Sequence, residues 1–308
     1  MTRREFLAQS GAFGALASKQ FAPRRTRAPA MPRYYDAAKL RRAGVASSSF
    51  RDLFPSARSA SLRERRRAPG LLDFPQVVED RYLLHHVEFA SPQLSTTDPQ
   101  YLYKLRRRLE QAHSRLINVA IRDPALDAGG GLSARDTFAR FAAVQAMKRW
   151  MDVARRLGAG FVSSRPGSIN PADLTPTLKS CRELAAYGRL RRVSLLIENG
   201  PGADPGNIVD VIRESGSRVG ALPDFGAFSS ARARTAGLEL LFPHAFSLCH
   251  ADGVSFDAQG NETAFDFRAC IEIAKRSRFR GIYCVRYDGR GDPYEGVQNV
   301  LNELIRYS

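Results

Sequence analysis

The sequence lacks long apolar runs and has few cysteines. No stretch of about eighteen or more apolar residues occurs in the 308 residues, and a membrane-spanning helix needs roughly that length. The four cysteines, Cys181, Cys249, Cys270 and Cys284, show no C-x-x-C spacing, which favours small buried side chains over a disulfide framework or a zinc knuckle. We therefore expect no membrane span and one large domain with an apolar core.

Acidic residues are fewer than basic ones, but the imbalance is local. The chain has 47 Lys and Arg against 31 Asp and Glu, a net charge of +16. Residues 1–70 hold 16 basic and 4 acidic residues, a net of +12, and the remainder carries only +4. A basic leader and a solvated Arg-rich helix near 62–67 account for this charge better than a nucleic-acid-binding face. No nucleic-acid partner is expected.

The N-terminal segment resembles an export signal of the twin-arginine type. Residues 2–7 read Thr-Arg-Arg-Glu-Phe-Leu, a mildly apolar stretch follows at 12–17, and 28–30 read Ala-Pro-Ala, as at a small-residue cleavage site. We expect residues 1–35 to be a signal and basic linker, with the folded domain at 36–308. The resemblance implies an exported, periplasmic protein; the alternative is a basic tail on a cytoplasmic protein.

From residue 40 onward, short β-rich runs alternate with longer amphipathic segments. Such alternation is typical of parallel βαβ units, and eight repeats predict an α/β fold of the closed (β/α)₈ TIM-barrel type. The helical segments are expected at 98–114, 134–157, 174–187, 205–214 and 266–277. The eight strands are expected at 44–48, 84–89, 116–121, 160–164, 193–198, 219–224, 245–250 and 281–286.

Charged and polar residues stand where several of these strands end, namely Glu88, Glu198, Asp224, His250 and Arg286. The carboxyl ends of the strands form the active-site face of such a barrel. One acidic residue closing an apolar strand is ordinarily a salt bridge to the next strand, since burying it otherwise is costly. Several converging on one rim favour a functional site.

Four segments resemble the sugar phosphate isomerase/epimerase superfamily, the xylose isomerase-like TIM barrels. Residues 195–200 (Leu-Leu-Ile-Glu-Asn-Gly) and 219–228 (Val-Gly-Ala-Leu-Pro-Asp-Phe-Gly-Ala-Phe) are similar to its fifth and sixth strands. Residues 256–266 and 279–289 match its last two units. The resemblance, which extends over roughly 40–305, implies the same barrel and a sugar or polyol derivative as the ligand.

The same resemblance implies a divalent metal, Mn, Mg, Co or Zn, held by two glutamates, an aspartate and a histidine. Glu198 matches the first glutamate, Asp224 matches the aspartate and His250 matches the histidine. The alignment of His250 relative to Asp252 is open by one residue. The metal would polarise a carbonyl and acidify the neighbouring C–H, while Glu198 and the second glutamate move the proton.

At the second glutamate position the chain carries Arg286. A guanidinium cannot ligate a metal, and it keeps its charge. Arg286 is therefore expected to lie between Glu198 and Asp224 as an internal replacement for the metal charge. Whether the protein binds a divalent metal is accordingly left open. Asp288, two residues on, would supply the missing carboxylate only if the strand end bulges.

Three functions follow from these observations. The first is metal-assisted proton transfer on a sugar or polyol derivative, with a partly degenerate site. The second is a non-catalytic or remodelled barrel that binds a carbohydrate or an anion at Arg51, Glu88, Arg165 and Arg286. The third, an endonuclease IV-like nuclease, needs a histidine-rich zinc cluster, and five histidines in largely unsuitable positions argue against it. A homodimer is an open expectation, because barrels of this family often pair.

Overall fold

The computed structural model describes residues 37–53 and 70–308. The predicted signal segment at 1–35 and the Arg-rich segment at 62–67 lie outside the described residues. Among the described residues, no helix combines the length and apolar character that crossing a membrane requires.

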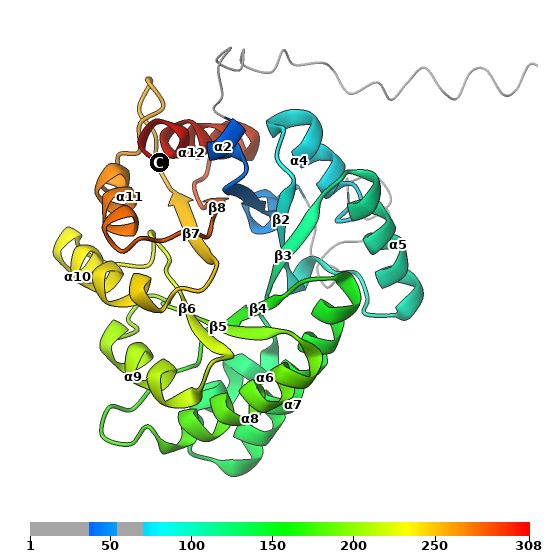
Figure 1. Ribbon diagram of the computed structural model, residues 1–308, viewed down its shortest axis with the longest axis vertical. Helices are drawn as coiled ribbons and strands as arrows, with labels where there is room; N and C mark the ends of the chain where they lie inside the picture. The colour runs from blue at the N-terminus through cyan, green and yellow to red at the C-terminus, as the bar shows by residue number, and fades with distance from the viewer. Residues whose placement is uncertain (1–36, 54–69) are drawn as a thin grey trace, which may run out of the picture. The chain divides into compact units, whose positions relative to one another are not determined.

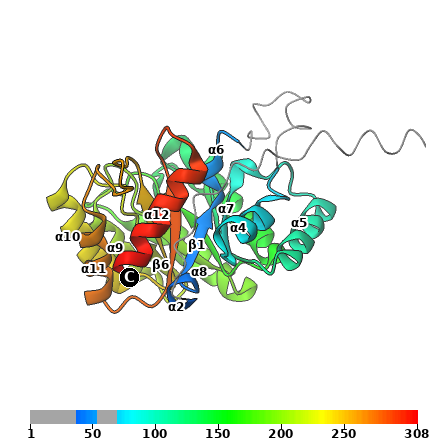
Figure 2. The same cartoon turned by 90° about the horizontal axis from the view of Figure 1, so that it is seen from above.

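Eight parallel strands form the centre of the molecule, in the order β6-β5-β4-β3-β2-β1-β8-β7. Figure 1 and Figure 2 show the helices outside this ring of strands. The predicted (β/α)₈ TIM-barrel fold is confirmed. The strands are β1 (Ala43–Ala46), β2 (His86–Ala90), β3 (Arg115–Ala120), β4 (Phe161–Ser164), β5 (Ser194–Glu198), β6 (Val219–Leu222), β7 (Leu248–Gly253) and β8 (Ile282–Tyr287).

Strand β7 is displaced from its prediction, since it begins at Leu248 rather than at 245. The short 3₁₀ helix η4 (Phe242–His244) occupies the preceding residues, and Pro243 lies in its first turn. Proline fixes its own φ and cannot donate to a strand ladder. The shift places both His250 and Asp252 inside β7, where residues two apart face the same side.

Helices follow the strands as the alternating pattern predicts. Several begin at an aspartate whose side chain accepts a hydrogen bond from a backbone N–H of the first turn, as Asp136, Asp204 and Asp266 do. The helices are α2 (Ala37–Leu40), α4 (Phe74–Tyr82), α5 (Pro99–Gln111), α6 (Pro124–Asp127), α7 (Thr137–Leu157), α8 (Thr175–Arg191), α9 (Pro205–Ser215), α10 (Ala231–Leu241), α11 (Phe267–Arg276) and α12 (Pro293–Tyr307).

Two apolar clusters fill the interior. The larger one packs the strands against the helices. The smaller one includes Leu196, Leu222, Leu248 and Cys284. Because strand side chains alternate between the two faces, the residues two positions further along β5, β7 and β8 extend the same side toward the strand ends. Those residues are Glu198, His250 and Arg286. The smaller cluster thus forms an apolar layer inside the barrel. Glu198, His250 and Arg286 form a polar layer next to it, toward the carboxyl ends of the strands.

The ring closes between β6 and β7 by isolated bridges rather than by a regular ladder. Ala221 pairs with Ala245, and Asp224 pairs with His250, both in parallel. His250 donates its backbone N–H to the Pro223 carbonyl at 2.8 Å, and the backbone N–H of Phe225 donates to the His250 carbonyl at 3.2 Å. This seam holds two of the predicted site residues next to each other.

Candidate functional site

The five charged and polar residues predicted at strand ends all lie at the carboxyl end of the barrel. Glu88 belongs to β2, Glu198 ends β5, Asp224 follows β6, His250 belongs to β7 and Arg286 belongs to β8. Because the strands are parallel, their carboxyl ends meet at one face. All five take part in one network of polar contacts.

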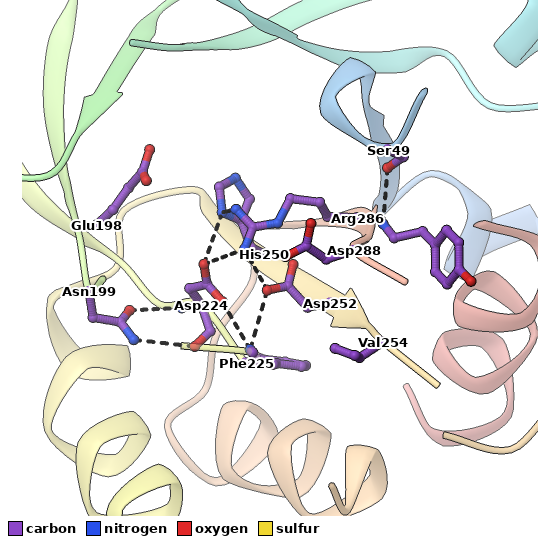
Figure 3. A network of polar contacts seen from close by, with 12 residues as sticks. Ser49, Glu198, Asn199, Asp224, Phe225, His250, Asp252, Val254, Arg286 and Asp288 are labelled. Atoms are coloured by element: carbon purple, nitrogen blue, oxygen red, sulfur yellow. Dashed lines mark hydrogen bonds and ion pairs between the residues drawn. The ribbon is translucent and has the colours of Figure 1, made fainter. Parts of the chain in front are cut away.

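Arg286 is the centre of one half of this network (Figure 3). Its Nη2 donates to Asp224 Oδ2 at 2.5 Å and to Asp252 Oδ2 at 2.6 Å, and its Nη1 lies 3.1 Å from His250 Nδ1. The expected position between Glu198 and Asp224 is therefore corrected: the second carboxyl is that of Asp252. The physical reason is the register of β7, which turns His250 and Asp252 to the same side.

Glu198 is held by a different guanidinium, that of Arg122. Arg122 follows β3 and donates from Nη2 to Glu198 Oε2 at 2.5 Å and from Nη1 to Oε1 at 3.2 Å. Ser163 Oγ also donates to Oε1, at 2.7 Å. Burial is the largest single influence on the pKa of Glu198 and raises it, but Arg122, with smaller contributions from His250 and the Ser163 hydrogen bond, lowers the pKa to about 2. Glu198 is thus an ionised carboxylate with both oxygens occupied.

The two halves of the network are joined through Asn118 and Glu88. Asn118 Nδ2 donates to Glu88 Oε2 and to Ser163 Oγ, both at 2.8 Å. Glu88 in turn lies 3.0 Å from His250 Nε2 through its Oε2. Polar contacts therefore run without a break from Arg122 to Arg286, through side chains of β2, β3, β4, β5, β7 and β8.

Two opposing influences act on His250, which is fully buried. Burial and the Arg286 guanidinium lower its pKa, while the contacts with Glu88 and Asp224 raise it. Arg286 Nη1, however, carries only donors, so its contact with His250 Nδ1 needs a lone pair on that nitrogen. On the basis of this contact we assign His250 as the neutral imidazole. Its Nε2 carries the proton and donates a hydrogen bond to Glu88. A proton on Nδ1 would face a guanidinium at 3.1 Å.

Asp224 and Asp252 share Arg286 but differ in their pKa. Burial raises the pKa of both carboxyls. At Asp224, Arg286 reverses this and holds the pKa below its usual range. At Asp252, burial and the Asp224 carboxylate outweigh Arg286 and hold the pKa well above its usual range. Asp224 is therefore the ionised member of the pair, and Asp252 is the member that holds a proton.

The donor atoms of this site do not fit a divalent metal while Arg286 is present. The guanidinium engages the Asp224 oxygen and the His250 nitrogen that would ligate the ion, and Arg122 engages both oxygens of Glu198. Guanidinium has no lone pair and repels a cation. Within residues 37–53 and 70–308, no group of three or more His, Cys, Asp or Glu is arranged to hold a metal ion. The metal ligation expected of Glu198, Asp224 and His250 thus stays a prediction that these contacts do not support.

Two adjoining cavities open above the network. One has a volume of about 310 Å³, and the other has about 490 Å³. Arg165 lines both of them. The charged residues lining the smaller cavity are Arg51, Glu88, Arg122, Arg165, Arg286 and Asp288.

The three predicted ligand-binding residues, Arg51, Glu88 and Arg165, all line the smaller cavity. Arg51 donates to Asp288 Oδ1 at 2.6 Å, so Asp288 forms a half-exposed ion pair and does not enter the Arg286 cluster. Arg165 is exposed, and among the described residues it has no hydrogen-bond or ion-pair partner for its guanidinium. Within the described residues, Arg165 is therefore the lining arginine whose guanidinium is not paired and is available to a ligand.

Sequence reasoning missed Arg122, Asn118 and Ser163 as members of the network, and it considered Asp252 only in connection with the register of His250. Arg122 directly follows a predicted strand, so the rule that singled out Glu198 also applies to it. Asp252 lies two residues after His250, the spacing that places both on one face of a strand. Asn118 and Ser163 lie inside apolar strands, and a single small polar residue there carries little signal.

The fold and the network define a class of protein, a parallel barrel with a charged cluster at the carboxyl ends of its strands. The chain belongs to the Xylose isomerase-like TIM barrel family, whose model matches residues 84–306. A comparison with curated protein sequences finds no match.

Solved structures of low sequence identity share the fold. A xylose isomerase domain protein from Planctomyces limnophilus is 14% identical, with a TM-score of 0.64 over 90% of this chain and 98% of that one. An L-ribulose 3-epimerase is 15% identical, with a TM-score of 0.64 over 86% and 94%. A xylose isomerase-like TIM barrel protein from Mycobacterium smegmatis, in complex with magnesium, is 14% identical, with a TM-score of 0.60 over 88% and 99%. At such identities the likeness shows the architecture alone.

Proposed function

We propose that the barrel mouth binds a small hydroxylated anion, a sugar or polyol derivative that carries a carboxylate or a phosphate, and that it does so without a divalent metal. The observation that carries this proposal is the set of guanidinium groups around one cavity. Arg51, Arg122, Arg165 and Arg286 all line the space of about 310 Å³. Guanidinium groups suit carboxylate and phosphate oxygens, which accept two parallel hydrogen bonds.

The balance of charge at the wall of the smaller cavity supports an anionic ligand. Four arginines line it, against two acidic residues, Glu88 and Asp288. Asp224 and Glu198, the ionised partners of Arg286 and Arg122, are buried, and neither lines this cavity. Because Arg51, Arg122 and Arg286 each have a carboxylate partner, Arg165 is the lining arginine that can give its full charge to an anionic ligand.

The polar groups around the two cavities support a hydroxylated ligand. Ser48 and Gln93 line the smaller cavity, and Ser168 and Asn207 line the larger one. Volumes of this size are typical of small-molecule sites. Two structures of the same fold are titled as D-psicose 3-epimerases, one in the presence of D-fructose and one with D-tagatose, so sugars are the first ligands to test.

Metal-assisted isomerisation was the other expectation for this barrel. It needs free lone pairs on Glu198, Asp224 and His250, and all three side chains already accept from guanidinium groups. We therefore place ligand binding ahead of that chemistry. Isomerase activity that depends on added metal is an outcome that the test below detects.

The test is calorimetric titration of the full chain with D-fructose 6-phosphate, D-gluconate and D-fructose, each with and without EDTA. At least one anion should bind at least tenfold more tightly than fructose, and EDTA should leave its affinity unchanged. Equal affinity for fructose, or loss of binding in EDTA, would overturn the proposal.

Arg165→Gln is the matched variant, because this side chain has no partner within the described fold and its loss leaves no buried charge. A charged hydrogen bond contributes about 1.5–3 kcal/mol, which corresponds to a loss of affinity of roughly tenfold or more. Arg155→Gln is the control, since Arg155 is equally exposed but lies in the last turn of α7, which leads to the amino end of β4. Anion binding that survives Arg165→Gln unchanged would contradict the assignment of Arg165.

A further inference from the structure

Two cavities adjoin the arginine-lined mouth of the barrel, and each could hold a small molecule by itself. Their volumes are about 310 Å³ and about 490 Å³. Small-molecule sites have volumes from about 300 Å³ upward, so neither cavity is too small to be occupied. The anion proposed above is assigned to the smaller one, where four arginines line the wall. The larger cavity is therefore available to a further part of the same ligand.

The larger cavity lies between two loops at the carboxyl ends of β4 and β5. Residues 165–169 form one wall, and residues 200–204 form the other. Ser133 fixes the first loop, because its backbone N–H and its hydroxyl both donate to the Pro166 carbonyl, at 3.0 and 2.8 Å. A backbone hydrogen bond of 3.0 Å across 200–203 closes the second loop into a turn. The cavity is thus preformed, which lowers the entropic cost of binding.

The larger cavity is far less basic than the smaller one. Among the described residues that line it, Arg165 is the only basic side chain, and Glu198 and Asp204 are acidic. Glu198 is already paired with Arg122, which leaves one cation and one exposed carboxylate. These two charges balance, so the space favours an uncharged group over a second anion.

The rest of the lining matches the two kinds of surface that a sugar ring presents. Pro166, Ile169 and Pro201 offer apolar atoms to the C–H faces of a ring. Ser168 and Asn207 offer hydrogen bonds to its hydroxyl groups, and neither side chain has a hydrogen-bond partner within the described part of the chain. Apolar walls with a few polar groups are typical of small-molecule sites.

Arg165 lies where the two cavities meet, and it lines both of them. The ion pair of Arg122 and Glu198 also lies at this boundary, because Arg122 lines the smaller cavity and Glu198 lines the larger one. A Cβ atom at Gly200 would lie 2.8 Å from both Cδ and Nε of Arg165. The absence of a side chain at Gly200 thus allows Arg165 to lie against the backbone of this loop. A ligand that contacts Arg165 can extend to either side of it.

We propose that the larger cavity is a subsite for a second, uncharged sugar ring. The ligand of this barrel is then a glycosylated sugar acid or sugar phosphate rather than a single sugar. Its anionic unit lies in the smaller cavity, its neutral ring lies between the two loops, and Arg165 contacts it where the cavities meet. This inference rests on the anionic ligand proposed above.

The experiment varies the number of sugar units and the charge independently. The full chain is titrated calorimetrically with D-galactose, D-gluconate, lactose and lactobionate, in which galactose is linked to gluconate. D-fructose 6-phosphate and sucrose 6-phosphate form a second pair of anions. A second ring that gains a hydrogen bond and an apolar contact should raise affinity by roughly tenfold or more in at least one pair. Disaccharide anions that bind no more tightly than the monosaccharide anions in both pairs would overturn the inference.

The same titrations separate this inference from the proposed function. If lactobionate binds no more tightly than lactose, and gluconate no more tightly than galactose, the anionic ligand is refuted and the subsite inference is refuted with it. If the anions bind more tightly than the neutral sugars but the second ring adds nothing, only the subsite inference is refuted.

Ser168→Trp fills the larger cavity without changing the charge of the chain. It should reduce the ratio of the lactobionate affinity to the gluconate affinity to about one, because steric exclusion removes the contacts of the second ring. Asn207→Ala is a milder variant and should lower the same ratio severalfold through one lost hydrogen bond. The control is Ser217→Trp, since Ser217 is also exposed but precedes β6 at the amino end of the barrel. A ratio that both cavity variants leave at the wild-type value would contradict the subsite.

Discussion

Replacing Arg122 with glutamine removes one of the two guanidinium groups that contact buried carboxylates in the polar network. The substitution keeps a polar side chain but removes the guanidinium from both oxygens of Glu198. Glu198 is 1% exposed and would keep only the donor of Ser163. The carboxyl then either stays ionised without a cation or takes up a proton, and each alternative destabilises the folded state at neutral pH.

The expected loss follows from the pKa of Glu198. The pKa is lowered from 4.5 to about 2, and each unit of pKa corresponds to about 1.4 kcal/mol between the two protonation states. Arg122 is the largest of the influences that lower this pKa, so Arg122→Gln should reduce the free energy of unfolding at pH 7 by an amount on the order of 3 kcal/mol. This agrees with the loss of about 3–5 kcal/mol that accompanies removal of one partner from a buried ion pair.

Urea unfolding at several pH values measures this effect and its sign. A carboxyl whose pKa is depressed in the folded state stabilises that state fully above its unfolded pKa and loses the effect as the pH falls. The difference between wild type and Arg122→Gln should therefore be constant near neutrality. It should shrink as the pH falls from about 4.5 toward about 2.

Two controls complete the experiment. Arg107→Gln breaks an exposed pair with Glu110, three residues along the same helix, and should cost less than about 0.5 kcal/mol. Arg122→Gln combined with Glu198→Gln removes both charges and should be more stable than Arg122→Gln alone. A loss below about 1 kcal/mol in the single variant, or a double variant less stable than the single one, would refute the reasoning.

Two further predictions concern neighbours of this pair. Asp252→Asn should flatten the dependence of the free energy of unfolding on pH. The raised pKa of Asp252 stabilises the folded wild type below the unfolded pKa of about 3.9, and this contribution is lost as the pH rises. The asparagine variant has no such contribution to lose. Wild-type urea curves that decline no more steeply than those of Asp252→Asn above pH 4 would contradict this. Ser163→Ala should cost about 1–3 kcal/mol, because it removes a donor from Glu198 and an acceptor from Asn118. Ser164→Ala should cost less, since Ser164 donates only to the carbonyl of the next residue; an equal loss by chemical denaturation would count against the network.

The barrel could be predicted from the sequence because its strands are short β-rich runs that recur between amphipathic segments. The eight expected strands all overlap observed ones. Helices α2, α4, α6, α10 and α12 lie outside the expected helical segments. Two of them carry start signals that sequence reasoning missed: Ser230 caps α10, and Asp292 caps α12 and is followed by Pro293. The later start of β7 was also not predicted, because a one-turn 3₁₀ helix is too short to give a clear pattern in the sequence.

The residues of the polar layer could be predicted better than their pairing. A charged residue at the end of an apolar strand is visible in the sequence, and Glu198, Asp224 and Arg286 were found in this way. Which arginine reaches which carboxyl depends on the stagger of neighbouring strands, and that is set by the whole ring. Arg286 therefore reaches Asp252, while Arg122 takes Glu198.

The position of the Arg286 cluster at the β6–β7 seam has a consequence for how this barrel can change. Asp224 and His250 form the bridge that joins the last two neighbouring strands, and Arg286 ties Asp224 to Asp252 across that junction. The Arg286 guanidinium therefore adds side-chain contacts to the backbone bridge that closes the ring. Loss of the Arg286 contacts should therefore weaken the closure of the ring at this seam as well as change the site. Substitutions that change specificity are accordingly expected first at Arg51 and Arg165, on the rim, where no strand junction depends on the side chain.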